Sequence, residues 1–135
     1  MNELEAIKSR CDAIEACYEF MLAYAAQGVA DDRASQYGSQ LRELLAKAVD
    51  AARDLPAAYA AMAAALPPGT SQQYSNFLGL LKEDTAKALA AMALVLAQTK
   101  ISSQLVDNLN ASLHVRTLLT DVFLVDEIVA LQQRS

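Results

Sequence analysis

The final stretch of the chain, from about Ser102 to Gln132, has more apolar positions than one helix face can hold. At the helical step of ~100° per residue, apolar residues cover most of its circumference, which predicts one long helix. A narrow polar strip, expected to face water, consists of Asp107, Asn110, His114, Thr117 and Asp121. One apolar stripe beside it consists of Leu105, Leu109, Leu119, Phe123 and Ala130. A second stripe keeps three- and four-residue spacing throughout and consists of Ala111, Val115, Leu118, Val122, Val125 and Val129.

The second stripe is the feature that needs an explanation. A helix in a simple bundle buries one apolar face, so a second face implies a central position or cover from a partner chain. We interpret the second apolar face as one that a partner chain covers. The stripe from Ala111 to Val129 is therefore predicted to form a homodimer interface.

Three more helices precede this one. Apolar periodicity predicts the first from about Asn2 to Gln27, a second ending at the Pro67-Pro68-Gly69 turn, and a third from about Ser71 to Gln98. Pro56 is predicted to cause a kink or a short break near Asp54. Short links favour antiparallel neighbours, so we expect an all-α, up-down-up-down four-helix bundle forming a single domain over residues 1–135.

Charge and composition narrow the possible partners. The net charge of -5 at pH 7 repels phosphate backbones and anionic lipid surfaces, so nucleic acid is a poor candidate partner. The acidic opening lacks the pattern of a secretory signal, and the most apolar windows are shorter than the ~20 residues that span a bilayer. The sequence therefore predicts a cytoplasmic protein without a membrane span.

The residues that most often carry chemistry are scarce. Cys11 and Cys17 are six residues apart on one predicted helix, beyond disulfide reach, so both are expected as reduced thiols, with Cys11 buried and Cys17 more exposed. The lone histidine, His114, lies in the polar strip and is expected at the surface. Cysteine–histidine zinc sites, di-iron sites and common catalytic motifs cannot be assembled, so no metal, cofactor or catalytic residue is predicted.

A polar row interrupts the apolar arc of the last predicted helix. Asn108, Ser112 and Arg116 follow one another at four-residue spacing. A buried guanidinium needs a carboxylate or an anionic ligand. One interpretation is structural: an ion pair with Asp84 or Asp126, or an arginine that reaches water at a bundle edge. The other is an anion-binding pocket in which Arg116 grips a carboxylate or phosphate, Asn108 and Ser112 orient it, and a tyrosine closes the wall. The tyrosine candidates are Tyr18, Tyr59 and Tyr74.

These patterns favour a non-enzymatic interaction or accessory protein that forms a homodimer through the last helix. The alternative is a sensor or carrier that binds a small anionic molecule at Arg116. An enzyme is the weaker hypothesis, because no general base can be named. Four-helix bundles serve many unrelated functions, so the expected fold does not choose between these possibilities.

Overall fold

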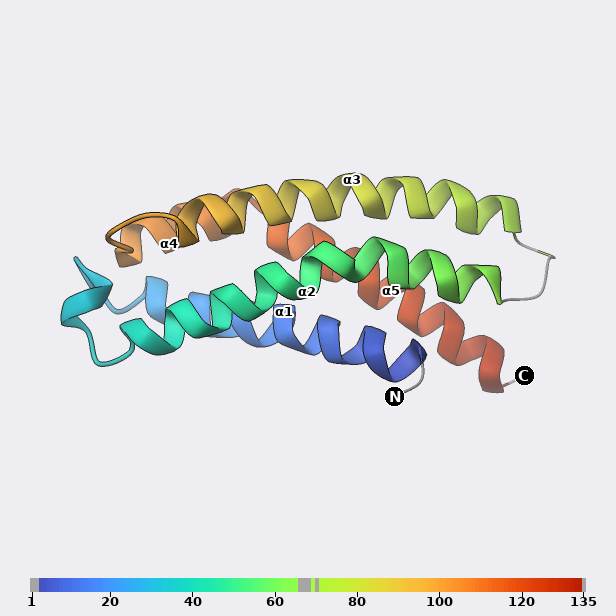
Figure 1. Ribbon diagram of the computed structural model, residues 1–135, viewed down its shortest axis with the longest axis horizontal. Helices are drawn as coiled ribbons and strands as arrows, with labels where there is room; N and C mark the ends of the chain where they lie inside the picture. Colours follow the sequence, from blue (N-terminus) through green and yellow to red (C-terminus); the bar gives the residue numbers. More distant parts are fainter. Residues whose placement is uncertain (1–2, 66–68, 70, 135) are drawn as a thin grey trace.

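The computed structural model describes residues 3–65, 69 and 71–134, and in this part of the chain all regular structure is helical (Figure 1). The elements are α1 (Glu3–Ala25), a short 3-10 helix η1 (Asp32–Ala34), α2 (Gly38–Ala64), α3 (Ser71–Leu96), α4 (Ser103–Ala111) and α5 (His114–Arg134). The all-α class predicted from the sequence is confirmed. Of the predicted turn before α3, Pro67 and Pro68 lie outside the described residues.

The helices lie lengthwise in an elongated molecule. In Figure 1, α1 begins at the right, α2 and α3 each reverse the direction, and α4 and α5 together lead back to the right. α1 packs against α2, α4 and α5, and α3 packs against α2, α4 and α5. The first turn of α1 and the last turn of α5 therefore lie at the same end of the molecule.

α2 continues through Pro56 without interruption. The short break predicted near Asp54 does not occur. Proline removes one helical hydrogen bond, but Leu55 and Tyr59 on either side are fully buried and hold the neighbouring turns in place. The alternative outcome, a kink, stays a prediction.

The last predicted helix is two helices. α4 ends at Ala111, and α5 begins at His114 after Leu113, which has a φ of 66°. This left-handed conformation costs an L-residue roughly 1–2 kcal/mol. The Ser112 hydroxyl donates to the carbonyl of Leu109 at 2.6 Å, which supports the helix end before the break.

The break changes which faces of the chain are buried. In one continuous helix, the buried positions of α4, Val106 and Leu109, would point ~150° away from those of α5, such as Leu118 and Val122. The turn at Leu113 lets both sets face the same interior. The residues buried before the break and those buried after it thus belong to two successive helices.

The predicted dimer stripe is corrected by this arrangement. Five of its members are at most 7% exposed within the single chain, whereas Ala111 is exposed. The five buried residues are Val115, Leu118, Val122, Val125 and Val129. Because the chain's own helices cover them, the reason for assigning this stripe to a dimer interface is removed.

The buried face of α1 is wider than the predicted seam. Cys11 is 4% exposed, as predicted. Cys17 is fully buried, so the prediction that it is the more exposed cysteine is wrong. It lies between Ile14 and Met21 on a face that the other helices cover completely. Both cysteines are unpaired thiols.

A buried carboxylate ties three segments together at one end of the molecule. Asp32, 3% exposed, accepts hydrogen bonds from Nε of Arg42 at 2.6 Å and from the backbone N–H of Ile101 at 2.7 Å. Arg42 also donates to three carbonyls beyond or at the end of α3, those of Leu96, Gln98 and Thr99. We call Asp32, Arg42 and Ile101 the Asp32 cluster. It satisfies carbonyls that a helix end leaves without partners.

A second set of hydrogen bonds joins α1 to the start of α4. The Tyr24 hydroxyl donates to the carbonyl of Ile101 at 2.7 Å, and the Ser103 hydroxyl donates to the carbonyl of Tyr24 at 2.6 Å. Two further hydrogen bonds join Ser103 to Val29. The backbone N–H of Val29 donates to the Ser103 hydroxyl oxygen, and the backbone N–H of Ser103 donates to the Val29 carbonyl, each at 2.8 Å. The end of α1 and the start of α4 are therefore fixed to each other.

Asp32→Asn is predicted to lower the free energy of unfolding by about 2–3 kcal/mol, because hydrogen bonds to a buried charge are lost. Burial alone raises the pKa of Asp32, but the hydrogen bonds from Arg42 and Ile101, with the charge of Arg42, outweigh it and hold this pKa below its usual value. The stabilisation is therefore present at neutral pH and is lost as the pH falls through the folded-state pKa. Urea unfolding measures the change. Asp31→Asn, which removes an exposed ion pair with Arg33, is the control; equal losses in both variants would contradict the prediction.

Gly38→Ala is predicted to destabilise the protein by about 1–3 kcal/mol, since overpacking forces the backbone apart. A Cβ at position 38 would lie 1.8 Å from the carbonyl oxygen of Asp32. Gly79→Ala in α3 is the matched control, because a Cβ there meets nothing within 4 Å. It should stabilise the helix by about 0.5–1 kcal/mol. Urea unfolding of both variants checks the opposite signs, and a shared sign would refute this account.

Candidate functional site

The residues that the structure describes contain neither a metal-binding cluster nor a membrane-spanning helix. Within residues 3–65, 69 and 71–134, no three His, Cys, Asp or Glu side chains are placed to hold a metal ion together. Over the same residues, no helix has both the length and the apolar content needed to cross a bilayer. The candidate sites are grooves between helices and the carboxylates buried near them.

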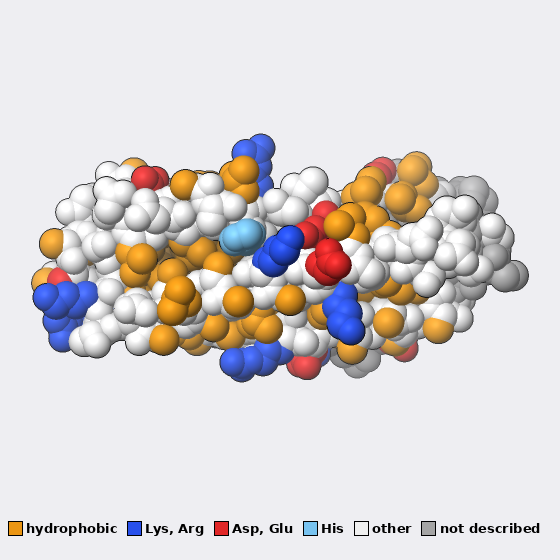
Figure 2. Space-filling view, turned by 90° about the horizontal axis from the view of Figure 1, so that it is seen from above, with side chains coloured by type: hydrophobic (Ala, Val, Ile, Leu, Met, Phe, Trp, Pro, Cys, Tyr) orange, Lys and Arg blue, Asp and Glu red, His pale blue; other side chains and the backbone are white. Residues whose placement is uncertain are grey.

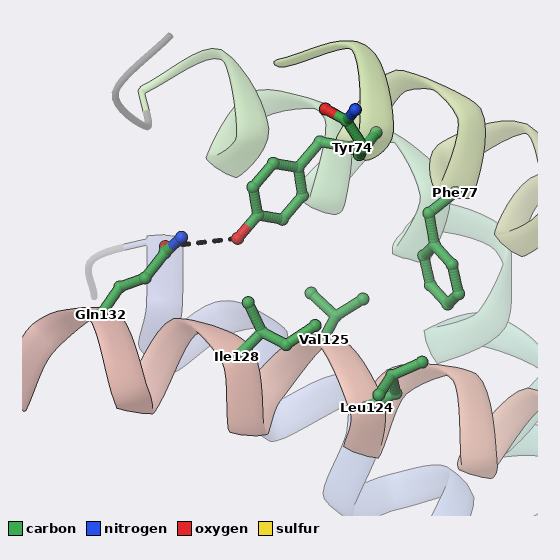
Figure 3. A pocket seen from close by; sticks show the side chains of 7 residues that line it. Tyr74, Phe77, Leu124, Val125, Ile128 and Gln132 are labelled. Carbon is green, nitrogen blue, oxygen red and sulfur yellow. Dashed lines mark hydrogen bonds between the residues drawn. The ribbon is translucent and has the colours of Figure 1, made fainter. Parts of the chain in front are cut away.

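A largely apolar groove lies between α3 and α5 (Figure 3). It encloses about 290 Å³. Tyr74 and Phe77 extend from α3 toward α5, where Leu124, Val125 and Ile128 line the opposite wall. At one end the Tyr74 hydroxyl donates to Oε1 of Gln132 at 3.2 Å, and Gln73 completes the lining. The lining residues that the structure describes include no carboxylate, histidine, lysine or arginine, so the groove favours apolar binding.

One wall of the groove continues as an exposed apolar ridge on α5. Leu124, Ile128 and Leu131 are 52%, 38% and 55% exposed. Their spacing of four and three residues places them on one helix face. We call these three residues the α5 ridge. A ridge beside a groove of the same chemistry is typical of a surface that packs against another helix.

Isolated apolar side chains occur elsewhere on the surface. Leu94 and Leu113 are 66% and 51% exposed, and Figure 2 shows hydrophobic side chains toward both ends of one face, with charged side chains near its middle. Single exposed leucines are ordinary in folded proteins. The α5 ridge differs from Leu94 and Leu113 because two of its three residues line a concave apolar groove.

The sequence interpretation did not single out the α5 ridge, although a signal for it exists. The polar strip runs through Thr117 and Asp121, and its continuation at three- and four-residue steps is Leu124, Ile128 and Leu131. A strip that changes from polar to apolar along a helix indicates that its later part contacts an apolar surface instead of water. Following the strip to its end would have identified the ridge.

The polar strip does not lie wholly in water. The side-chain amide of Asn110 and the Oδ2 atom of Asp121 are buried without a hydrogen-bond partner among the described residues. Asp121 on α5 and Asp84 on α3 are neighbouring carboxyls. Burial, followed by the hydrogen bond with Asp84 and the charge of Asp84, raises the pKa of Asp121 to about 7. Because two close carboxylates repel each other, the pair holds one proton up to near-neutral pH.

The predicted polar row is not assembled into a pocket. Asn108, Ser112 and Arg116 are all exposed, and the helix break at Leu113 separates the first two from the third. Arg116 lines a separate groove between α1 and α5, of about 340 Å³, together with three polar side chains of α1: Glu15, Tyr18 and Glu19. Two carboxylates in the lining of the same groove disfavour a further anion there. Neither suggested partner pairs with Arg116, since Asp84 faces Asp121 and Asp126 binds Tyr59.

Three helices contribute to a chain of hydrogen bonds that the sequence analysis did not foresee. The Tyr59 hydroxyl of α2 donates to Oδ1 of Asp126 on α5 at 2.7 Å, and the Cys11 thiol of α1 lies 3.5 Å from the same hydroxyl. Burial raises the pKa of Cys11 to about 11, and burial also raises the pKa of Tyr59. Both groups therefore stay protonated at neutral pH. Cys11 is not an activated nucleophile, and the chain directs its protons toward the Asp126 carboxylate.

Asp121→Asn is predicted to flatten the pH dependence of stability. A carboxyl whose folded-state pKa is raised favours folding at low pH, and that contribution is lost as the pH rises from about 4 to about 7. The wild-type Tm should therefore fall between about pH 5 and about pH 8, while Asn, which is neutral and can donate to Asp84, should remove most of the fall. Circular dichroism melts measure it. Asp107→Asn, an exposed residue, is the charge-matched control, and parallel curves for wild type and Asp121→Asn would contradict the prediction.

No family model, curated protein or solved structure matches this chain. Its function is therefore inferred from the geometry of these surfaces.

Proposed function

We propose that the chain is a non-enzymatic interaction protein that self-associates through the α5 ridge and the groove beside it. The observation that carries this proposal is the groove between α3 and α5, whose described lining is apolar apart from Tyr74 and two glutamines. In this proposal the helices form an antiparallel four-helix bundle whose fourth helix is divided into α4 and α5. The two unpaired cysteines fit a reducing compartment, in agreement with the cytoplasmic location we expect.

The choice of a second copy as the occupant rests on self-complementarity. Leu124 and Ile128 both line the groove and project from it as part of the ridge. In a two-fold arrangement, the ridge of each copy lies in the groove of the other, and the same residues are buried twice. The described residues of the groove lining offer no charge that would select a charged partner. A copy of the same uncharged surface meets this requirement.

The last helix thus keeps its proposed role, but through different residues. Val122 and its stripe pack inside the chain, so a substitution such as Val122→Glu would disrupt folding before it tested association. The alternative of an anionic ligand at Arg116 has less support, because Glu15 and Glu19 line the same groove.

Leu124→Glu is predicted to weaken self-association at least about tenfold, because it places a charge in the buried centre of the contact. Sedimentation velocity from micromolar to near-millimolar concentration measures the change. Leu94→Glu on α3 is the matched control, since Leu94 is 66% exposed and away from the groove. It should associate as the wild type does. Circular dichroism melts verify that both variants fold.

Two results would overturn the proposed function. The first is a wild-type protein that sediments as a monomer even at near-millimolar concentration. The second is a dimer that Leu94→Glu and Leu124→Glu weaken equally, since the contact would then not depend on the α5 ridge.

A further inference from the structure

A second cavity, on the opposite face of α5, differs in chemistry from the apolar groove. It encloses about 370 Å³ between three helices, namely α1, α5 and the end of α2 at Met62. Its apolar lining includes Ile7, Met62, Phe123 and Val129. This volume lies within the range of small-molecule sites, which are apolar with a few polar groups that fix orientation.

Asp126 is a polar group at this cavity with an incomplete set of hydrogen-bond partners. It is half-buried, and its Oδ1 accepts the hydrogen bond from Tyr59. Across the residues with described side chains, no donor reaches its Oδ2 and no cation lies within salt-bridge distance of the carboxylate. Cys11 supports Tyr59 from the other side, so the carboxylate is held in one position. One oxygen is satisfied and the other is available to a donor in the cavity.

The charge around Asp126 favours a cation. Asp12 also lines the cavity, and Lys8 is the one basic residue among the described residues of its lining. Asp12 forms no salt bridge with Lys8 in the described part of the chain. Burial and then the negative charge of Asp12 raise the pKa of Asp126, whereas the hydrogen bond from Tyr59 lowers it. A bound cation would relieve both the desolvation and the repulsion.

We propose that this cavity binds a small organic cation, an amine or ammonium with an apolar body, whose charged head donates to or contacts Asp126 and whose body packs on Ile7, Met62 and Val129. The Phe123 ring adds a face that attracts cations. Tyr59 orients the carboxylate without touching the ligand's charge. The site is separate from the α5 ridge, so it does not depend on self-association.

The test compares three straight-chain probes of about the same size, each with six carbons. Hexylamine is cationic at neutral pH, hexan-1-ol is neutral and hexanoate is anionic. Titration of the full chain, followed by NMR of its amide and methyl groups, should show saturable shifts at Ile7, Met62 and Asp126 with hexylamine. Hexan-1-ol and hexanoate should bind at least about tenfold more weakly, because neither pairs with the carboxylate.

Asp126→Asn keeps the shape of the side chain and an oxygen for Tyr59 but removes the charge. We expect it to weaken hexylamine binding at least about tenfold. Asp50→Asn, which makes the same change of net charge at an exposed position on α2, should leave binding within about twofold of the wild type, as expected of a screened surface charge.

Several outcomes would overturn the proposal. These are no saturable shifts with hexylamine, equal binding of hexan-1-ol, or unchanged affinity in Asp126→Asn. If Asp126→Asn fails to fold, the wild-type comparison of the three probes decides alone. Loss of association in Leu124→Glu with hexylamine binding retained would confirm that the two sites are distinct.

Discussion

The reversal of the buried face at Leu113 is the constraint on which the rest of the structure depends. Val106 and Leu109 are buried before this turn, and Val115 and Leu118 are buried after it. Without the left-handed turn, these two pairs would point in opposite directions. One set would then lie in water. Burying a side chain of this size contributes about 1.5–3 kcal/mol, which exceeds the roughly 1–2 kcal/mol cost of a left-handed leucine. The break is therefore favoured by tertiary burial, against local preference.

The two ends of the molecule differ in their hydrogen bonding. One end is fixed by many hydrogen bonds, and the other contains the apolar groove. At one end, the Asp32 cluster and the hydrogen bonds of Ser103 tie the loops and α4 to α1 and α2. At the other, the α3–α5 contact includes a groove with a single side-chain hydrogen bond of 3.2 Å described across it, from Tyr74. A rigid end that positions α5, combined with a groove that its own side chains do not fill, is an arrangement suited to binding.

Periodicity alone was sufficient to predict the first three helices, because apolar positions in them recur on one face without interruption. It failed at Leu113, since neither glycine nor proline marks the break and leucine rarely adopts a positive φ. That one omission produced the false dimer stripe and the apparent polar row at Arg116. The Asp32 cluster was also missed, because its partners are up to 69 residues apart in the sequence and no local pattern announces them. The α5 ridge was within reach of the sequence, whereas the cavity at Asp126 required three helices to be placed first.

Three aspartates near the helix contacts differ in how the chain compensates their buried charge, and this difference separates residues that stabilise the fold from residues that can bind a ligand. Asp32 receives an arginine and a backbone N–H, so its desolvation is compensated and its pKa is lowered. Asp121 meets another carboxyl, and a shared proton replaces the missing cation. Asp126 receives one hydroxyl and faces Asp12, which leaves its charge only partly compensated beside an apolar cavity. The chain fully compensates the buried charge of Asp32. It removes the charge of Asp121 by protonation, and it compensates the charge of Asp126 only in part. Among these three aspartates, Asp126 is the one at which an external cation would gain most, because its charge is only partly compensated beside an apolar cavity.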